Sequence, residues 1–168
     1  GEAYWKQFFV EGGEQIHFYG KAPAKTTTRV RRLSWELGAE RTSRLRSMAG
    51  APKAGSEEAF LLETFAAILV GYLYCLNRQS TYTIGIPFHN RRSKEFKQTI
   101  GFFSEVLPVR LEVSDEETFV SFIGKVKTEV FKAARHGQCA VANPYFRRLY
   151  DVVLNYHTRS FSNFAGMA

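Results

Sequence analysis

Residues 84–110 read IGIPFHNRRSKEFKQTIGFFSEVLPVR, and this stretch decides the fold. Gly85 and Pro87 mark the end of a run of β-branched residues, so a strand is expected over residues 82–87. A second strand is expected over residues 106–113, because apolar and polar residues alternate there with period two. A connection rich in basic residues joins the two runs. The stretch therefore predicts two strands around a charged loop.

Two long helices are expected next to these strands. Ser56 is a good N-cap residue, and apolar residues recur at helical spacing over residues 56–77, with Phe65 among those expected in the core. The run from Ser114 to Glu117 has the pattern of a capping box, so a helix is expected to follow it. Strands that alternate with long amphipathic helices indicate an α/β layered architecture.

Weaker patterns lie toward the ends of the chain. A short helix with aromatic residues on one side is expected over residues 2–10. Residues 26–37 are rich in Thr, Val, Leu and Trp and predict a strand, and a helix with Met48 and Ala49 buried is expected just after it. A final strand is expected over residues 150–156.

Composition limits the possible partners. The chain has 168 residues, 45% of them hydrophobic, so one ordered domain with one core is expected. Its net charge of +7 favours an acidic protein or a phosphate-bearing group, or else reflects a solvated face that is balanced elsewhere in a larger protein. Nucleic acid is not expected, because no recognition motif or basic stripe with interleaved aromatic residues appears.

Membrane insertion is not expected either. The longest apolar run, residues 65–75, is shorter than the roughly 20 residues that span a bilayer, so it is expected to form a core helix. No export signal appears in this sequence, and its two cysteines do not form a disulfide framework. A cytoplasmic location is therefore expected.

Several short motifs, in order along the chain, resemble those of one enzyme family. Residues 100–110 (IGFFSEVLPVR) resemble the IGxFVNTLPLR signature of nonribosomal peptide synthetase condensation domains. Tyr4-Trp5 resembles the family's YW, residues 136–138 (HGQ) resemble its HQ motif, and residues 150–156 (YDVVLNY) resemble the strand that follows.

The resemblance implies a chloramphenicol acetyltransferase-like layered fold, in which two similar lobes enclose a channel. This chain would be a single C-terminal lobe with a mixed sheet flanked by helices. Residues 1–25 would be the interlobe connector helix and loop, and residues 26–168 the lobe, incomplete at its C-terminal end. The family's HHxxxDG motif belongs to the other lobe, and no two of the four histidines here are adjacent. No catalytic residue is therefore expected in this chain.

The resemblance also implies an activity. It is amide formation between aminoacyl and peptidyl thioesters, held on the phosphopantetheine arms of donor and acceptor carrier-protein domains. The N-terminal lobe of the same domain is a further expected partner. No metal or bound cofactor is expected beyond those arms, because the His and Cys spacing offers no pair of ligands on one element. Two alternatives stay open: an acyltransferase of the same fold that uses a free acceptor or a coenzyme A thioester, and a non-catalytic docking lobe.

Three residues are expected to line the channel, namely Asn155, His157 and Ser104. In the family, an asparagine at the position of Asn155 faces the catalytic histidine. An amide within an apolar strand also needs an explanation, and the alternative is that Asn155 satisfies a neighbouring strand end. His157 shares its face because strand side chains alternate. Ser104 and Glu105 stand where the family has Val-Asn.

A second set of residues is expected to hold the fold together. It matches family motif positions and consists of Gly85, Pro87, Arg91, Gly101 and Arg110. Arg91 is expected to bridge loops by charge-assisted hydrogen bonds rather than to act on a substrate. His136 is expected near the C-terminal end of a helix, where a cationic side chain is favourable.

Overall fold

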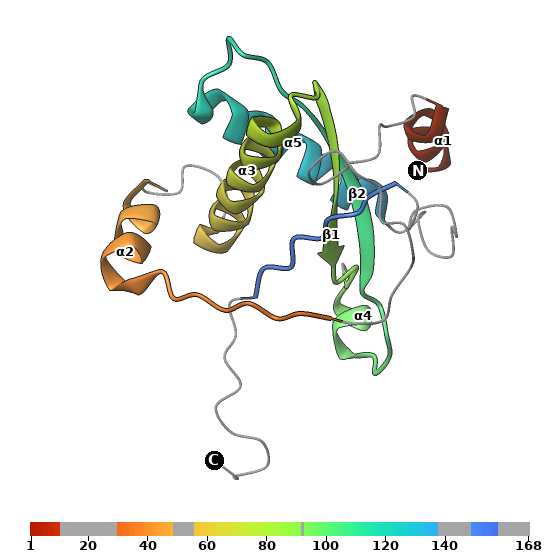
Figure 1. Ribbon diagram of the computed structural model, residues 1–168. Helices are drawn as coiled ribbons and strands as arrows, with labels where there is room; N and C mark the ends of the chain where they lie inside the picture. The colour runs from red at the N-terminus through yellow and green to blue at the C-terminus, as the bar shows by residue number, and fades with distance from the viewer. Residues whose placement is uncertain (11–29, 49–55, 92, 138–148, 158–168) are drawn as a thin grey trace.

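The computed structural model describes residues 1–10, 30–48, 56–91, 93–137 and 149–157. Figure 1 shows the two strands at the centre, with helices around them. The elements, in chain order, are α1 (Glu2–Val10), α2 (Gly38–Met48), α3 (Glu57–Asn77), β1 (Thr81–Phe88), α4 (Lys94–Gln98), β2 (Glu105–Glu112) and α5 (Phe119–His136). The α/β architecture with helices beside a sheet is the one that the sequence predicts.

Strands β1 and β2 form an antiparallel pair in which Gly85 lies opposite Pro108. The N–H and C=O groups of Gly85 bond to residues 152 and 154, so they point away from β2. Gly85 and Pro108 are therefore a non-hydrogen-bonded pair, and the missing N–H of Pro108 costs the β1–β2 ladder nothing. The backbone nitrogen of Pro108 instead faces the outer edge of β2, where a proline is tolerated.

On its other side, β1 contacts the extended segment 149–157. Gly85 N–H donates to the carbonyl of Val152 at 2.8 Å, and Leu154 N–H donates to the carbonyl of Gly85 at 2.9 Å. The sheet is the antiparallel pair β1–β2, and the parallel contact expected of a mixed sheet is one isolated bridge between Gly85 and Val153. The expected full strand is wrong in extent, because the next ladder bond would need an N–H on Pro87. The segment crosses β1 and then leaves it (Figure 1).

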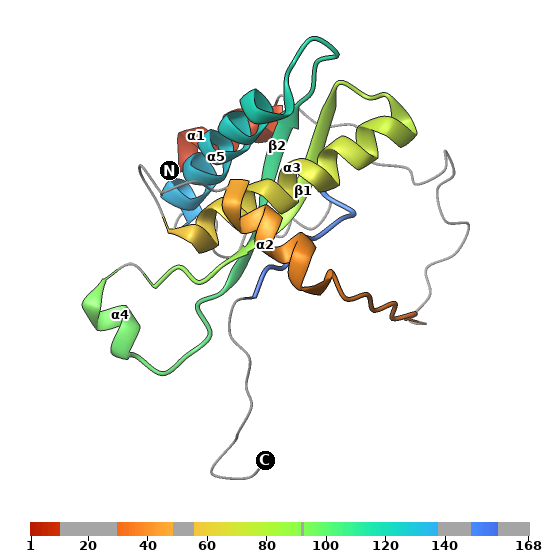
Figure 2. The same cartoon turned by 90° about the vertical axis from the view of Figure 1, so that its left-hand side faces the viewer.

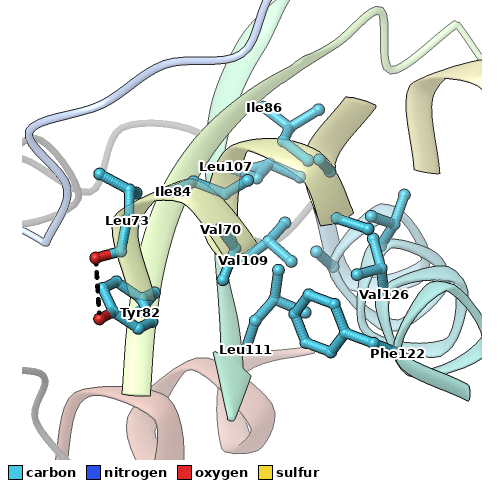
Figure 3. Close-up of a cluster of buried hydrophobic side chains, with 14 of the residues drawn as sticks. Val70, Leu73, Tyr82, Ile84, Ile86, Leu107, Val109, Leu111, Phe122 and Val126 are labelled. Carbon is cyan, nitrogen blue, oxygen red and sulfur yellow. Dashed lines mark hydrogen bonds between the residues drawn. The ribbon is translucent and has the colours of Figure 1, made fainter. Parts of the chain in front are cut away.

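The core lies between the strands and helices α3 and α5, which Figure 2 shows together in front of the strands. Ala66 and Ala67 of α3 are fully buried, and their small side chains let the helix approach closely. Tyr82 Oη donates to the carbonyl of Leu73 at 3.2 Å, so β1 is joined to the last turns of α3 (Figure 3). Leu107, Val109 and Leu111 of β2 are buried as the predicted alternation requires, but Pro108 between them is buried as well.

Helix α3 begins where it is predicted to begin. Ala59 N–H donates to Ser56 Oγ at 3.2 Å, so Ser56 is the N-cap residue. The predicted buried stripe is only partly right, because Phe65, which is expected in the core, is half-buried. Apolar residues lie on most sides of this helix, so their spacing gives only a weak signal of which face is buried. By length and composition α3 could also cross a membrane, although here one side packs into the core.

The start of α5 differs from the prediction. The run from Ser114 to Glu117 forms a turn, in which Glu117 N–H donates to the carbonyl of Ser114 at 3.1 Å. The helix begins after Thr118, whose Oγ1 accepts from Ser121 N–H at 3.2 Å. The Glu117 carboxylate pairs with Lys125 Nζ at 2.7 Å instead of reaching back to Ser114. A second capping residue four positions later displaced the helix start.

The predicted strand over residues 26–37 is wrong for residues 30–37, and residues 26–29 lie outside the described part of the chain. Residues 30–37 are exposed and pair with neither β1 nor β2, and Trp35 is 82% exposed. Helix α2 follows as expected, but Met48 is exposed rather than buried. Ala49, the other residue expected in that core, lies outside the described residues.

Candidate functional site

One group of polar side chains lies where β1 ends and β2 begins. The antiparallel register pairs Phe88 with Glu105, so it brings His89 and Ser104 to the same end of the pair. His89 Nδ1 and Ser104 Oγ are 3.4 Å apart, which is a long hydrogen bond. His89 is exposed and Ser104 is half-buried. The contact gives this end of the sheet one polar pair that is open to solvent.

Arg91 organises the connection between the two strands. Its Nη1 donates to the carbonyls of Phe96 and Thr99 at 2.5 and 2.6 Å, and its Nη2 donates to the carbonyl of Gly101 at 2.7 Å. The guanidinium also lies over the ring of Phe103, 4.4 Å from its centroid. Charge-assisted bonds of this kind are about twice as strong as neutral ones. Arg91 therefore ties together the backbone of residues 96–101 by hydrogen bonds to three of its carbonyls.

The same loop contains features that the sequence does not predict. Helix α4 is capped by Ser93, whose Oγ accepts from Phe96 N–H at 3.2 Å. Beyond α4, Ile100 is fully exposed and Phe102 is 91% exposed. The serine before Lys94 is the one sequence signal that could have revealed this short helix.

Gly85 stands at the crossing of β1 and the segment 149–157. A Cβ at this position would lie 2.7 Å from Cε2 of Tyr150 and 2.8 Å from Cγ1 of Val106. No side chain fits at such distances, so glycine is required for the ring of Tyr150 to pack here. The glycine thereby sets the path of the segment that carries Asn155 and His157.

Asn155 and His157 lie on the exposed side of that segment, while Leu154 and Tyr156 are half-buried. This alternation is the predicted one, because extended side chains point to opposite faces in turn. Asn155 is exposed, so the expectation of a buried amide within an apolar strand is wrong. Within the described part of the chain, no hydrogen bond joins Asn155 or His157 to Ser104.

Tyr156 shows that the inner side of the segment is packed. Its ring lies 5.8 Å from that of Phe65 on α3. Burial raises the pKa of the Tyr156 hydroxyl, an effect that Arg46 partly opposes and that Glu58 reinforces. The segment therefore presents polar groups outward from a partly fixed backbone. Such groups can donate or accept hydrogen bonds, and no set of three metal-ligating side chains gathers among the described residues.

The structure also brings together motif residues that lie far apart in the sequence. Trp5 Nε1 donates to the carbonyl of His136 at 2.9 Å, and the ring of Tyr4 stacks on the His136 ring with centroids 4.5 Å apart. Arg110 Nη2 donates to the carbonyl of Phe8 at 2.6 Å. Sequence reasoning treated these motifs as separate, because their order along the chain gives no signal of proximity.

The condensation domain family model matches residues 1–142. A linear gramicidin synthase of Brevibacillus parabrevis is 32% identical over 100 residues, which are 60% of this chain and 1% of that protein. Surfactin synthase subunit 1 of Bacillus subtilis (strain 168) is 24% identical over 135 residues, which are 80% of this chain and 4% of that protein. The chain thus spans a small fraction of the length of these relatives.

Solved structures give the same fold. The first condensation domain of the CDA synthetase matches with a TM-score of 0.68 at 24% identity, over 81% of this chain and 29% of that chain. The starter condensation domain of rhizomide synthetase, in a variant bound to C8-CoA, matches with a TM-score of 0.67 at 19% identity, over 92% and 35%. The fold and the family match over residues 1–142 agree, and the chain belongs to the condensation domain family.

Proposed function

We propose that this chain is the C-terminal lobe of a condensation domain, and that it takes part in amide formation in nonribosomal peptide synthesis. The observation that carries the proposal is the family match over residues 1–142, joined by relatives such as linear gramicidin synthase and surfactin synthase. In this proposal residues 1–25 are the connector between two lobes, and residues 26–168 are the lobe itself.

The substrates would be aminoacyl and peptidyl thioesters on the phosphopantetheine arms of donor and acceptor carrier-protein domains. The other partner would be the N-terminal lobe of the same domain, which carries the HHxxxDG motif in this family. The net charge of +7 supports an encounter with acidic carrier domains in the cytoplasm. The chemistry itself would then depend largely on positioning, which can supply on the order of 7 to 11 kcal/mol of such a barrier.

Asn155, His157 and Ser104 would line the channel between the lobes. Asn155 and His157 are exposed on one side of their segment, which leaves their polar atoms open to a substrate amide. Ser104 lies beside His89 at the end of β1. Gly85, Pro87, Arg91, Gly101 and Arg110 would hold the frame, since each lies in the sheet or in its connecting loop.

The test is amide formation by the intact condensation domain that contains this lobe, with loaded donor and acceptor carriers. Asn155→Ala should lower the rate roughly threefold to tenfold, because one hydrogen bond worth about 0.5 to 1.5 kcal/mol is lost. Gln98→Ala, which removes an exposed amide on α4, is the matched control and should leave the rate unchanged. An unchanged rate in Asn155→Ala would remove the residue from the channel.

The chain by itself should give only background product, because this sequence contains no HHxxxDG motif. Product above a control with carriers alone would contradict the proposed division of labour between lobes. If the intact domain acted on a coenzyme A thioester and not on loaded carriers, the acyltransferase alternative would replace the proposal. A folded domain that binds carriers and joins nothing would identify a docking lobe.

A further inference from the structure

Two sets of directional contacts join helix α1 to α5 and β2, in addition to the packing of its aromatic side on the core. At one point, Trp5 Nε1 donates to the carbonyl of His136, the last residue of α5, and Tyr4 stacks on the His136 ring with an interplanar angle of 23°. At the other, Arg110 of β2 donates to the carbonyl of Phe8 and lies over the Phe8 ring, 4.1 Å from its centroid. We call Tyr4, Trp5, Phe8, Arg110 and His136 the α1 anchor.

The surroundings of α1 show why these two points matter. Trp5 and Phe8 are buried, so the aromatic side of α1 joins the core. Beside them, residues of α1, β2 and α5 line a cavity of about 400 Å³. The cavity walls include Gln7, Glu112, Lys125, Glu129 and Lys132, which are polar or charged. The direction of α1 is therefore set by the anchor together with the apolar packing of its aromatic side.

We infer that the α1 anchor fixes the angle at which α1 enters this lobe, and that Trp5 and Arg110 are positioning residues for amide formation. The inference rests on the proposed function, in which α1 connects the two lobes. A helix of 9 residues is about 13 Å long, so a tilt of about 10° moves its far end by about 2 Å. A misplacement of about 1 Å at reacting groups can cost about a hundredfold in rate.

The choice of Arg110 fits this role in a way that a lysine would not. A guanidinium is planar, so it can stack on the Phe8 ring and donate to the Phe8 carbonyl at the same time. Trp5 likewise combines a buried ring with one N–H donor. Both side chains define a direction as well as a distance, which is what the orientation of a short helix requires.

The first experiment uses the chain itself and reads the anchor directly. A Trp35→Phe variant keeps Trp5 as the one remaining tryptophan, and Trp35 is exposed and outside the anchor. In this background Arg110→Ala should shift the Trp5 emission to longer wavelength and speed hydrogen exchange in α1, and Arg110→Lys should do so to a smaller degree. Arg44→Ala on α2 is the matched control and should change neither. Unchanged emission and exchange in Arg110→Ala would overturn the anchor.

The second experiment uses the intact condensation domain and measures lobe geometry and rate together. One dye is placed on Cys75, which is exposed on α3, after Cys139→Ser, and its partner is placed on a cysteine introduced into the preceding lobe. Arg110→Ala and Trp5→Phe should shift or broaden the energy-transfer distribution. They should lower kcat about tenfold to a hundredfold with KM for loaded carriers unchanged, and Arg110→Lys should recover part of kcat. If a variant only reduced the amount of folded protein, the active fraction would fall, but the energy-transfer distribution of the molecules that remain folded would not change.

The outcomes separate the two proposals. If the unaltered domain forms amides, and Arg110→Ala changes neither the interlobe distance nor kcat, the inference fails and the proposed function stands. If the unaltered domain forms no amide, the proposed function fails, and the energy-transfer measurement still decides whether the anchor sets the lobe angle. A distance that shifts with Arg110→Ala and not with Arg44→Ala supports the anchor's control of the lobe angle in either case, and the positioning role needs the loss of kcat as well.

Discussion

Residues 30–37 and residues 150–157 are both extended, and both have the composition of a strand, yet only one of them joins the sheet. Residues 150–157 bond to Gly85 on both sides of Val153, and their side chains alternate between exposed and half-buried. Residues 30–37 make no backbone hydrogen bond among the described residues, and their side chains are exposed. The two segments differ in whether a neighbouring strand accommodates them, and not in their own composition. Gly85 of β1 leaves room for Tyr150 to approach, and residues 30–37 have no such partner among the described elements.

The largest effect is expected when that room is filled. Gly85→Val would place a Cβ 2.7 Å from the Tyr150 ring, so the free energy of unfolding should fall by about 1 to 3 kcal/mol. Urea unfolding measures this change, and hydrogen exchange at the Leu154 amide should quicken at the same time. Gly124→Ala in α5 is the control, since open space surrounds it, and it should stabilise by about 0.5 to 1 kcal/mol. A stable Gly85→Val variant with a protected Leu154 amide would mean that the crossing is misplaced.

A smaller effect is expected from the two aromatic residues that distinguish the segments. Tyr150 is half-buried against Gly85, so Tyr150→Ala should cost about 1 kcal/mol. Trp35 is 82% exposed, and Trp35→Ala should change stability by less than about 0.5 kcal/mol. Thermal unfolding of the two variants side by side tests the comparison. Equal losses would show that residues 30–37 are packed after all.

The titration of Tyr156 should report whether residues 150–157 are in place. Burial raises its pKa above the ordinary value of 10.0, so packing favours the protonated hydroxyl. The stability that this packing contributes is complete below pH 10 and is lost as pH rises through the raised pKa. The difference in absorbance titration between the parent and Tyr156→Phe isolates this group. In the Gly85→Val variant, the pKa of Tyr156 from the same difference titration should move back toward 10. An unchanged pKa would show that the packing of Tyr156 does not depend on the contact between Gly85 and residues 150–157.

The smallest effect is expected at Pro87, which ends the parallel ladder. Pro87→Val restores an N–H that can donate to the carbonyl of Leu154. One added hydrogen bond is worth about 0.5 to 1.5 kcal/mol, and the loss of the proline's constraint on the unfolded chain offsets about 0.4 to 1 of it. Stability should therefore change little, while the Tyr156 amide becomes more protected in hydrogen exchange. Unchanged protection would mean that another feature turns the segment away from β1.

The sequence predicts the two paired strands and the two long helices, because each of these elements carries its own signal. Period-two alternation marks β2, and the Ser56 cap marks the start of α3. The predictions that failed needed information from outside the segment. Residues 30–37 needed a partner strand, the inner face of α3 needed a neighbour to select it, and α5 had two possible caps at Ser114 and Thr118.

The candidate site divides in the same way. The alternation that puts Asn155 and His157 on one side follows from local geometry, and it is confirmed. Their exposure does not follow from local sequence, because it depends on where the segment leaves β1. The meeting of Tyr4, His136 and Arg110 around α1 was likewise beyond prediction, since contacts between residues more than 100 positions apart leave no pattern in a single sequence.

The loop after β1 has a consequence for protein engineering. Arg91 binds the carbonyls of Phe96, Thr99 and Gly101 and lies over Phe103, so all of its described hydrogen bonds belong to the same short stretch. We therefore expect that residues 91–103 can be moved as one segment into another protein. When this segment is grafted into a related condensation domain, it should keep its conformation if Arg91 is included together with Phe96, Thr99 and Gly101. A graft that begins after residue 91 would separate the guanidinium from its acceptors and lose three charge-assisted hydrogen bonds in one step.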